Sequence, residues 1–249
     1  MTTFDFGDGQ GPVPAHRHEN PDGTEGGWVA ETASVADTCF VGRDAGVYGD
    51  AVIYGNAKVL GKAKVGGKAK IYGKAKVGGK AWVYGNAVIT GDVQVGGDAV
   101  ITENAQVWEE ARVYGEAWVL GKAKVLGKAV VAGHAWVHEN AKVEGNVWIH
   151  ENAKVFGNAY VEGEARVLGK AVVSGEAVIS GKAQVFGNAW VFEQAQVSGN
   201  ALVTGNARIF GKALVGGDVK VGGEVGVFGE VEISTGTYQG DEWIQGVPT

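Results

Sequence analysis

The chain has 249 residues, a hydrophobic content of 45% and a formal net charge of −6, which would ordinarily allow one or two globular domains. No apolar stretch approaches the roughly 20 residues that a membrane-spanning helix needs, and a single cysteine, Cys39, supports no disulfide framework. The opening residues MTTFDFGDGQ do not resemble a signal peptide. We therefore expect a cytoplasmic protein without membrane association, or a virion component if the chain is phage-encoded.

Residues 1–27 are rich in Gly, Pro and His and precede a regular repeat. The end of a stack of strands leaves unpaired backbone groups, which natural proteins usually cover. We interpret this segment as an irregular N-terminal cap or as an arm that packs on a partner. His16 and His18 form a His-x-His pair close to Glu19 and Asp22, but we interpret the pair as part of a solvated loop and expect no metal site.

A valine or isoleucine occupies every sixth position from Val29 to Ile233 without exception. Four residues after each of them stands a small residue, nearly always Ala, so that the motif reads V-x-G-x-A-x. A fixed six-residue period with one larger and one small apolar position indicates a parallel β-solenoid. The Val would point inward from a short strand, the Gly would supply the turn conformation, and the Ala would turn back into a narrow core.

Blocks such as GNAKVL, GKAKVL and GNAWVF resemble the hexapeptide repeats of the left-handed β-helix superfamily, over residues 28–234. The resemblance implies an all-β fold, a single-stranded left-handed parallel β-helix whose triangular coils contain eighteen residues each, about 11 coils in all. Many members of this family are acyltransferases and others are structural or interaction modules. Trimers are common among similar proteins, so the resemblance also implies a homo-oligomer, either a trimer or a dimer.

When the sequence is divided into coils of eighteen residues, the outward aromatic residues are distributed unequally among the three faces. One face, which we call the aromatic face, lies on the strands of Val29, Val47, Val65 and their successors at the same spacing. It carries eleven aromatic residues, against four on each of the other faces: Trp28, Tyr48, Trp82, Tyr84, Trp118, Trp136, Phe156, Trp190, Phe192, Phe210 and Phe228. Because a large exposed apolar surface normally marks a partner site, we predict that this face binds another copy of the chain or another protein.

Three histidines are the candidates for catalysis: His134 at a corner, His138 on the aromatic face and His150 on the third face. A general base needs a group that orients it and a pocket for substrate, and no inserted loop interrupts the repeat to form one. We expect no catalytic residue and no cofactor, and we interpret the chain as a non-catalytic interaction solenoid. The alternative is a hexapeptide-repeat acyltransferase that uses a CoA thioester.

Eight lysines and no Asp or Glu lie between Ala51 and Gly91: Lys58, Lys62, Lys64, Lys68, Lys70, Lys74, Lys76 and Lys80. This lysine band offers an anion-binding surface for a polyanion or a nucleotide-like ligand. Because the band would encircle the solenoid and contains no Arg, it does not favour nucleic acid, which is more often bound along one side. A merely solvated surface is the simpler interpretation.

Residues 235–249 leave the repeat, because Gln239 stands where the next Val would fall. Tyr238, Trp243 and Ile244 are large residues in a short segment. We expect a C-terminal cap or docking tail here.

Overall fold

The computed structural model describes residues 2–246 and divides into two compact units, Met1–Lys122 and Ala123–Thr249. Within the described range both units consist of short β-strands joined by tight corners, with no helix. A helix long and apolar enough to cross a membrane is accordingly not found in that range. The all-β class predicted from the repeat is confirmed.

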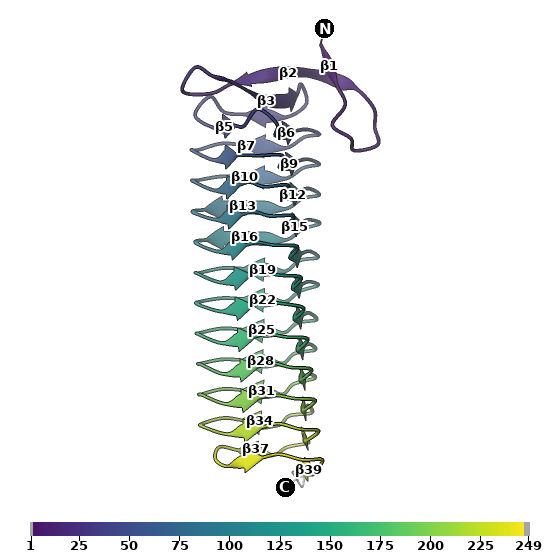
Figure 1. Ribbon diagram of the computed structural model, residues 1–249, viewed down its shortest axis with the longest axis vertical. Coiled ribbons are helices and arrows are strands. Elements are labelled where there is room, and N and C mark those ends of the chain that lie inside the picture. The colour runs from purple at the N-terminus through teal and green to yellow at the C-terminus, as the bar shows by residue number, and fades with distance from the viewer. Residues whose placement is uncertain (1, 247–249) are drawn as a thin grey trace. The chain divides into compact units, whose positions relative to one another are not determined.

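Three parallel sheets form the coils of the first unit. The aromatic face has β3 (Glu25–Ala30), β6 (Gly46–Val47), β9 (Lys64–Val65), β12 (Trp82–Val83), β15 (Val100–Ile101) and β18 (Trp118–Val119). The second sheet has β4 (Ser34–Val35), β7 (Val52–Ile53), β10 (Lys70–Ile71), β13 (Val88–Gly91) and β16 (Gln106–Glu109). The third has β5 (Phe40–Val41), β8 (Lys58–Val59), β11 (Lys76–Val77), β14 (Gln94–Val95) and β17 (Arg112–Val113). Figure 1 shows β7, β10, β13 and β16 stacked in this order.

The second unit repeats this arrangement. Its aromatic face has β21 (Trp136–Val137), β24 (Lys154–Val155), β27 (Val172–Val173), β30 (Trp190–Val191), β33 (Arg208–Ile209), β36 (Gly226–Phe228) and β39 (Trp243–Gln245). The second sheet has β19 (Lys124–Val125), β22 (Lys142–Val143), β25 (Tyr160–Val161), β28 (Val178–Ile179), β31 (Gln196–Val197), β34 (Leu214–Val215) and β37 (Glu232–Ile233). The third has β20 (Val130–Val131), β23 (Trp148–Ile149), β26 (Arg166–Val167), β29 (Gln184–Val185), β32 (Leu202–Val203), β35 (Lys220–Val221) and β38 (Thr237–Tyr238).

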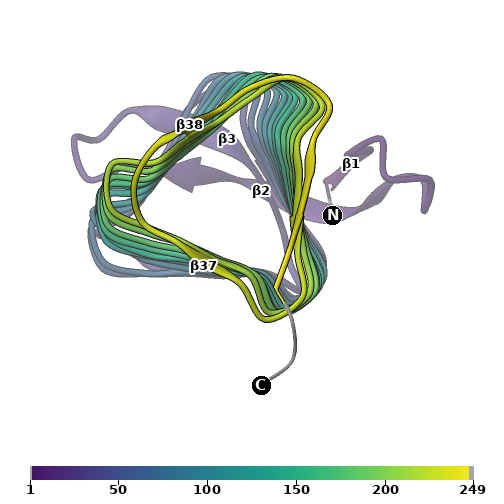
Figure 2. The ribbon, with the colours of Figure 1, turned by 90° about the horizontal axis from the view of Figure 1, so that it is seen from below.

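Strand register shows the length of a coil directly. In the first unit Val83 pairs with Ile101, and in the second unit Val173 pairs with Val191, so that successive strands of a sheet are one eighteen-residue coil apart. Seen end on, the coils of the second unit trace a triangle around a closed interior (Figure 2). The fold is the left-handed β-helix that the sequence predicts.

The interior is a dry column of aliphatic side chains. Val119 and Ala117 in the first unit and Val155 and Ala153 in the second are all 0% exposed, and burying one Val side chain contributes about 1.5–3 kcal/mol. The corners need a left-handed backbone. Gly49 has a φ of +63°, and a Cβ placed there would approach the Gly67 carbonyl oxygen of the next coil to 2.8 Å. Glycine therefore allows the coils to stack at strand spacing.

The N-terminal segment is more regular than its composition indicates. β1 (Thr3–Phe4) pairs antiparallel with β2 (Val13–Glu19), and β2 pairs antiparallel with β3, so the strand edge of β3 is paired. His16 Nδ1 lies 2.9 Å from Glu31 Oε1, whereas the buried His18 Nε2 lies 3.0 Å from the Cys39 carbonyl oxygen. The two imidazoles thus have separate partners, and the described residues contain no cluster of metal-ligating side chains.

The C-terminal segment continues two sheets after the six-residue phase is lost. Tyr238 pairs with Val221 and Ile244 pairs with Val227. The sequence separation between paired residues is therefore one residue shorter here than in the eighteen-residue coils. The phase break is a shortened corner after Ile233, and the chain re-enters the sheets beyond it. This places Trp243 on the aromatic face, next to Gly226.

Candidate interaction face

The structure places the eleven predicted aromatic residues on or directly beside the strands of the aromatic face in the two units. They occupy two rows, one before and one after the inward Val or Ile of each strand. The two rows differ in how far their rings are buried against the protein itself.

The row after the inward residue is a stacked ladder. Phe192 and Phe210 have ring centroids 4.9 Å apart with 7° between their planes, and Phe210 and Phe228 follow at 5.1 Å and 7°. His138 stacks on Phe156 in the same way, at 4.9 Å and 7°. Such pairs add roughly 0.5–1.5 kcal/mol beyond the area they bury. Because these rings pack on one another and stabilise neighbouring coils, they are less available to a partner. The predicted binding surface is therefore limited to the row before the inward residue.

Four tryptophans of the row before the inward residue are solvent-exposed, whereas Trp28 and Trp118 in the same row are half-buried. Trp82 is 40% exposed, Trp136 39%, Trp190 49% and Trp243 56%. The other large hydrophobic side chains that the described residues expose are Tyr54, Trp148 and Leu214. Four of seven therefore gather on one face. The sequence predicts Trp243 only as part of a C-terminal cap or docking tail and not as a member of the aromatic face, because the shortened corner takes it out of the eighteen-residue phase.

Cationic side chains alternate with these indoles. The Lys64 ammonium lies 5.0 Å from the ring centroid of Trp82, and the Lys154 ammonium lies 5.9 Å from that of Trp136. Arg208 is the register partner of Trp190 on the neighbouring strand of the same sheet. Both line a groove of about 380 Å³, whose other lining residues are Asn188, Asn206, Glu224, Asp241 and Trp243. The exposed row thus combines large apolar rings with positive charge, which favours cation–π contacts with a partner.

At the N-terminal end of the first unit, an arm of the chain already occupies the aromatic face. The ring of Phe4 stacks on Trp28 at 4.8 Å and 15°, and the ring of Phe6 stacks on Tyr48 at 5.2 Å and 27°. Phe6 fills the space above Gly46, where a Cβ would approach its Cδ1 atom to 3.1 Å. The arm therefore buries Tyr48, whose pKa is raised by desolvation.

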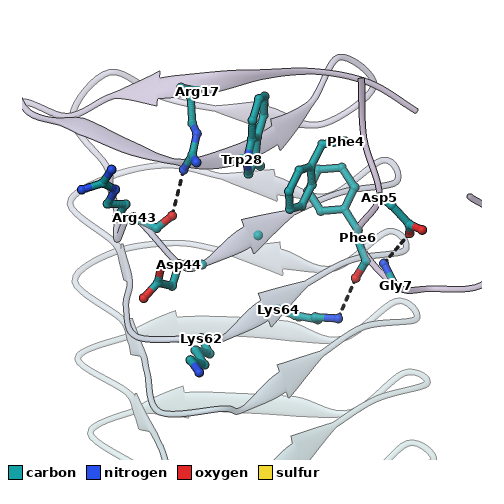
Figure 3. A pocket seen from close by; sticks show the side chains of 12 residues that line it. Phe4, Asp5, Phe6, Gly7, Arg17, Trp28, Arg43, Asp44, Lys62 and Lys64 are labelled. Carbon is teal, nitrogen blue, oxygen red and sulfur yellow. Dashed lines mark hydrogen bonds between the residues drawn. The ribbon is translucent and has the colours of Figure 1, made fainter. Parts of the chain in front are cut away.

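A groove of about 580 Å³ lies beside this arm, and Figure 3 shows the side chains around it. We call it the N-terminal groove. Its lining includes Phe4, Phe6 and Trp28 as an apolar wall and four cationic side chains, Arg17, Arg43, Lys62 and Lys64. Two carboxylates, Asp5 and Asp44, also line it.

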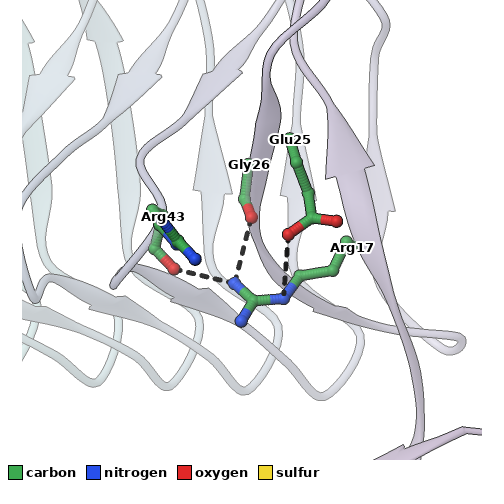
Figure 4. A network of polar contacts seen from close by, with 4 residues as sticks. All are labelled: Arg17, Glu25, Gly26 and Arg43. Atoms are coloured by element: carbon green, nitrogen blue, oxygen red, sulfur yellow. Dashed lines mark hydrogen bonds and ion pairs between the residues drawn. The ribbon is translucent and has the colours of Figure 1, made fainter.

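Arg17 is held rigidly at this groove, as Figure 4 shows. Its Nη1 donates to the carbonyl oxygens of Gly26 at 3.1 Å and Arg43 at 2.9 Å. Its Nε lies 4.0 Å from Glu25 Oε1, and its guanidinium carbon lies 4.5 Å from the ring centroid of Trp28. Lys64 is fixed as well, because its ammonium donates to the Phe6 carbonyl oxygen at 2.6 Å.

The lysine band does not form one surface. Lys58, Lys64, Lys70 and Lys76 lie on strands of all three sheets, and Lys62, Lys68, Lys74 and Lys80 lie at corners. Two members of the band line the N-terminal groove, Lys62 and Lys64. The arginines that accompany them were not among the predicted anion-binding residues, because the contact between residues 4–7 and the sheet joins distant parts of the sequence.

The three candidate histidines lie apart from the grooves described above. His138 belongs to the stacked ladder, and its Nδ1 is 3.7 Å from Glu139 Oε1. His134 lies in the corner before β21. His150 follows β23 on the third sheet, whereas His138 follows β21 on the aromatic face. The structure therefore does not bring these three imidazoles together on one sheet.

Stacked hexapeptide coils define the fold class of this protein, which is a hexapeptide-repeat β-solenoid of the left-handed β-helix type. A family model described as the YdcK β-solenoid repeat matches residues 81–97 and 195–211. The chain is also similar to the crystal structure of UDP-N-acetylglucosamine O-acyltransferase (LpxA) from Moraxella catarrhalis RH4. The TM-score is 0.50 with 17% identity over 69% of each chain, a likeness that shows the fold. No curated protein sequence matches the chain significantly.

Proposed function

We propose that the protein is a non-catalytic interaction solenoid that associates with a second copy of itself through the aromatic face. One observation carries the proposal: the exposed row of the second unit is arranged to complement itself. In strand order from β21 to β39 its outward residues are Trp136, Lys154, Val172, Trp190, Arg208, Gly226 and Trp243. Large rings, cations and short side chains alternate along it.

A two-fold axis parallel to the strands, midway between Trp190 and Arg208, would superpose this row on itself in the opposite direction. Trp190 would then face Arg208 of the second copy, and Lys154 would face its Trp243. Each of these contacts would occur twice, as in any isologous interface. Val172 would face Gly226, over which the Trp243 indole lies, since a Cβ at Gly226 would approach Trp243 Cε3 to 2.5 Å. An apolar contact between Val172 and this indole would therefore accompany the cation–π contacts.

The energetic terms favour weak, specific association. Each cation–π contact contributes about 0.5–1 kcal/mol when exposed and about 2 kcal/mol when desolvated. Seven strands at about 4.8 Å spacing extend over roughly 30 Å, so this row alone buries less than the area of a standard interface, about 800 Å² per partner. We expect a dissociation constant in the micromolar range.

Analytical ultracentrifugation over a range of protein concentrations tests the proposal. Trp190→Lys places a cation opposite the Arg208 guanidinium of the second copy and is expected to weaken dimerisation at least tenfold. Trp190→Glu removes the same ring but supplies a carboxylate for Arg208, so it is expected to weaken dimerisation less. Trp148→Lys is the matched control, because Trp148 is 50% exposed on the third sheet.

The outcomes separate the alternatives. Unchanged dimerisation of Trp190→Lys, or equal weakening by Trp148→Lys, would contradict self-association through the aromatic face. Equal weakening by the Lys and Glu variants of Trp190 would keep the face but reject the proposed two-fold register. A monomeric wild-type protein at high micromolar concentration would overturn the proposal as a whole.

The fold likeness to an O-acyltransferase supports the second candidate, an acyltransferase that uses a CoA thioester. Isothermal titration calorimetry with acetyl-CoA tests it, together with His134→Ala, His138→Ala and His150→Ala. Tight binding of acetyl-CoA that one of these changes abolishes would replace the non-catalytic proposal. His138→Phe is a useful comparison, because it preserves the stack on Phe156 while removing the imidazole nitrogens.

A further inference from the structure

We infer that the N-terminal groove binds a phosphate-type oxyanion of small size, free or carried by a small organic molecule. This site is separate from the exposed indole row of the second unit, and its residues all belong to the first unit. The inference follows from the number of cations around the groove, from the way two of them are held in place, and from the enclosure that the arm provides.

Arg17 is an organised donor at the groove. The hydrogen bonds of its Nη1 and its contact with the face of the Trp28 ring fix the guanidinium plane. Within the described residues, no acceptor forms a hydrogen bond with its Nη2. A guanidinium presents N–H donors in a planar fork that matches an oxyanion. Since the side chain is already ordered, less conformational entropy is lost when a ligand binds.

Lys64 adds a second positioned cation. An ammonium group has three donors, and the Phe6 carbonyl oxygen uses one of them. The remaining donors are available at a groove that this residue lines. Holding the ammonium on a carbonyl oxygen rather than on a carboxylate leaves its charge uncompensated, which favours an anionic ligand.

Arg43 and Lys62 complete the set. Both line the groove and are exposed, and no described residue forms a hydrogen bond or an ion pair with either side-chain charge. Of the two carboxylates in the lining, Asp5 accepts a hydrogen bond from the Gly7 amide at 2.8 Å. Glu25, which pairs with Arg17 from outside the lining, brings the number of carboxylates to three, so the four cations still give the groove a net positive charge.

The aromatic wall limits the kind of ligand. Phe4 stacks on the Trp28 ring and Arg17 also packs against that ring, so Trp28 is not a free platform for a nucleobase of the kind that single-stranded nucleic acids require. The arm closes one side of a groove of about 580 Å³ (Figure 3). We therefore assign the site to a small anion and not to a nucleic-acid strand.

The experiment measures binding of inorganic phosphate and of pyrophosphate by isothermal titration calorimetry, with the full chain at constant ionic strength in chloride. We expect saturable binding of both, and tighter binding of pyrophosphate because it presents more charge to the same cations. Arg43→Gln and Lys62→Gln are each expected to weaken binding about tenfold, since each removes one charge-assisted contact. Both side chains are exposed, so the fold is not at risk; circular dichroism verifies this.

Lys68→Gln and Lys74→Gln are the matched controls. They remove the same charge from the lysine band but do not line the groove, so they are expected to change the affinity less than twofold. Equal weakening by all four variants would show that only the general charge of the band attracts anions, which would overturn the site. No saturable heat with either anion up to about ten millimolar would also overturn it.

A third titration distinguishes the sources of the anion. We expect that any binding of a short DNA duplex at the same ionic strength does not depend on Arg43. Duplex binding that is stronger than pyrophosphate binding and is lost in Arg43→Gln would reject the small-anion assignment in favour of a nucleic-acid backbone. Glycerol 3-phosphate binding with an affinity at least equal to that of phosphate would show that the apolar wall accepts an organic group.

Discussion

The phenyl rings of Phe192 and Phe210 are stacked one coil apart, with centroids separated by 4.9 Å and planes 7° from parallel. Phe210 also stacks on Phe228 and meets the Trp243 indole edge to face at 6.2 Å. One ring therefore connects three neighbouring rings across successive coils, which makes it the centre of the ladder in the second unit.

Phe210→Ala should destabilise the second unit by about 2–4 kcal/mol, because it removes two stacked pairs and the apolar area they bury. Urea unfolding monitored by circular dichroism and by tryptophan fluorescence measures the change. Phe186→Ala is the control, since Phe186 is half-buried on the third sheet and the described residues give it no ring partner. A loss for Phe186→Ala as large as that for Phe210→Ala would show that the ladder has no special energetic role.

Glu151→Gly should stabilise the second unit by about 0.5–1 kcal/mol. Glu151 has a φ of +62° at a corner where most coils have glycine, and a non-glycine residue in this region costs about 1–2 kcal/mol. The greater flexibility of glycine in the unfolded chain offsets part of the gain. The midpoint of urea unfolding should rise accordingly.

The neighbouring corner provides the opposite test. Gly169 has a φ of +72°, and a Cβ there would approach the Gly187 carbonyl oxygen to 2.8 Å. Gly169→Ala should therefore destabilise the same unit by at least 1 kcal/mol. If both substitutions lowered the unfolding midpoint, the glutamate side chain would have to contribute more than the backbone strain costs.

Cys39 should be protected from thiol reagents in the folded protein. Its side chain is fully buried, and burial raises the pKa of its thiol, so both access and the reactive thiolate are restricted. Labelling with a chromogenic disulfide at pH 8 is expected to be slow in buffer and complete in urea. Rapid labelling in buffer would mean that the first coils open frequently.

The same thiol predicts a dependence of stability on pH. Because the folded state favours the neutral thiol, its contribution is complete below the pKa of the unfolded thiol, about 8.5, and is lost as the pH rises above that value. Cys39→Ala places the most common residue of this position in the core and removes the effect. The free energy of unfolding should therefore fall less between pH 8 and 10 in the variant than in the wild type.

Phe4→Ser combined with Phe6→Ser should detach the N-terminal arm. The two rings cover Trp28 and Tyr48, so their loss is expected to shift tryptophan emission to longer wavelength and to increase binding of a hydrophobic dye. Gln10→Ser, at an exposed position of the same arm, should leave both signals unchanged. Unaltered emission in the double variant would show that backbone pairing between β1 and β2 is sufficient to hold the arm.

Much of the fold could be read from periodicity. The inward positions of Val119 and Ala117 and the eighteen-residue register of Val83 with Ile101 follow from a period that strand alternation and corner glycines impose. Once this period is known, the grouping of aromatic residues on one face can be counted directly in the sequence. The shortened corner after Ile233 was harder to foresee. A lost phase in sequence does not reveal that the chain returns to the same sheets one residue early.

The candidate sites were less predictable than the fold. The sequence alone determined that the chain forms stacked coils and which side chains face outward on each sheet, because a repeat needs only local interactions with its neighbours. Its resemblance to hexapeptide-repeat proteins implied the left-handed form. The tertiary structure decided that the rings of Phe192 and Phe210 stack on each other, whereas the indoles of Trp190 and Trp243 are exposed to solvent. It also decided that Arg17 and Lys64 line the same groove, because the arm joins residues far apart in the chain and no periodic pattern records where a non-repeating segment packs.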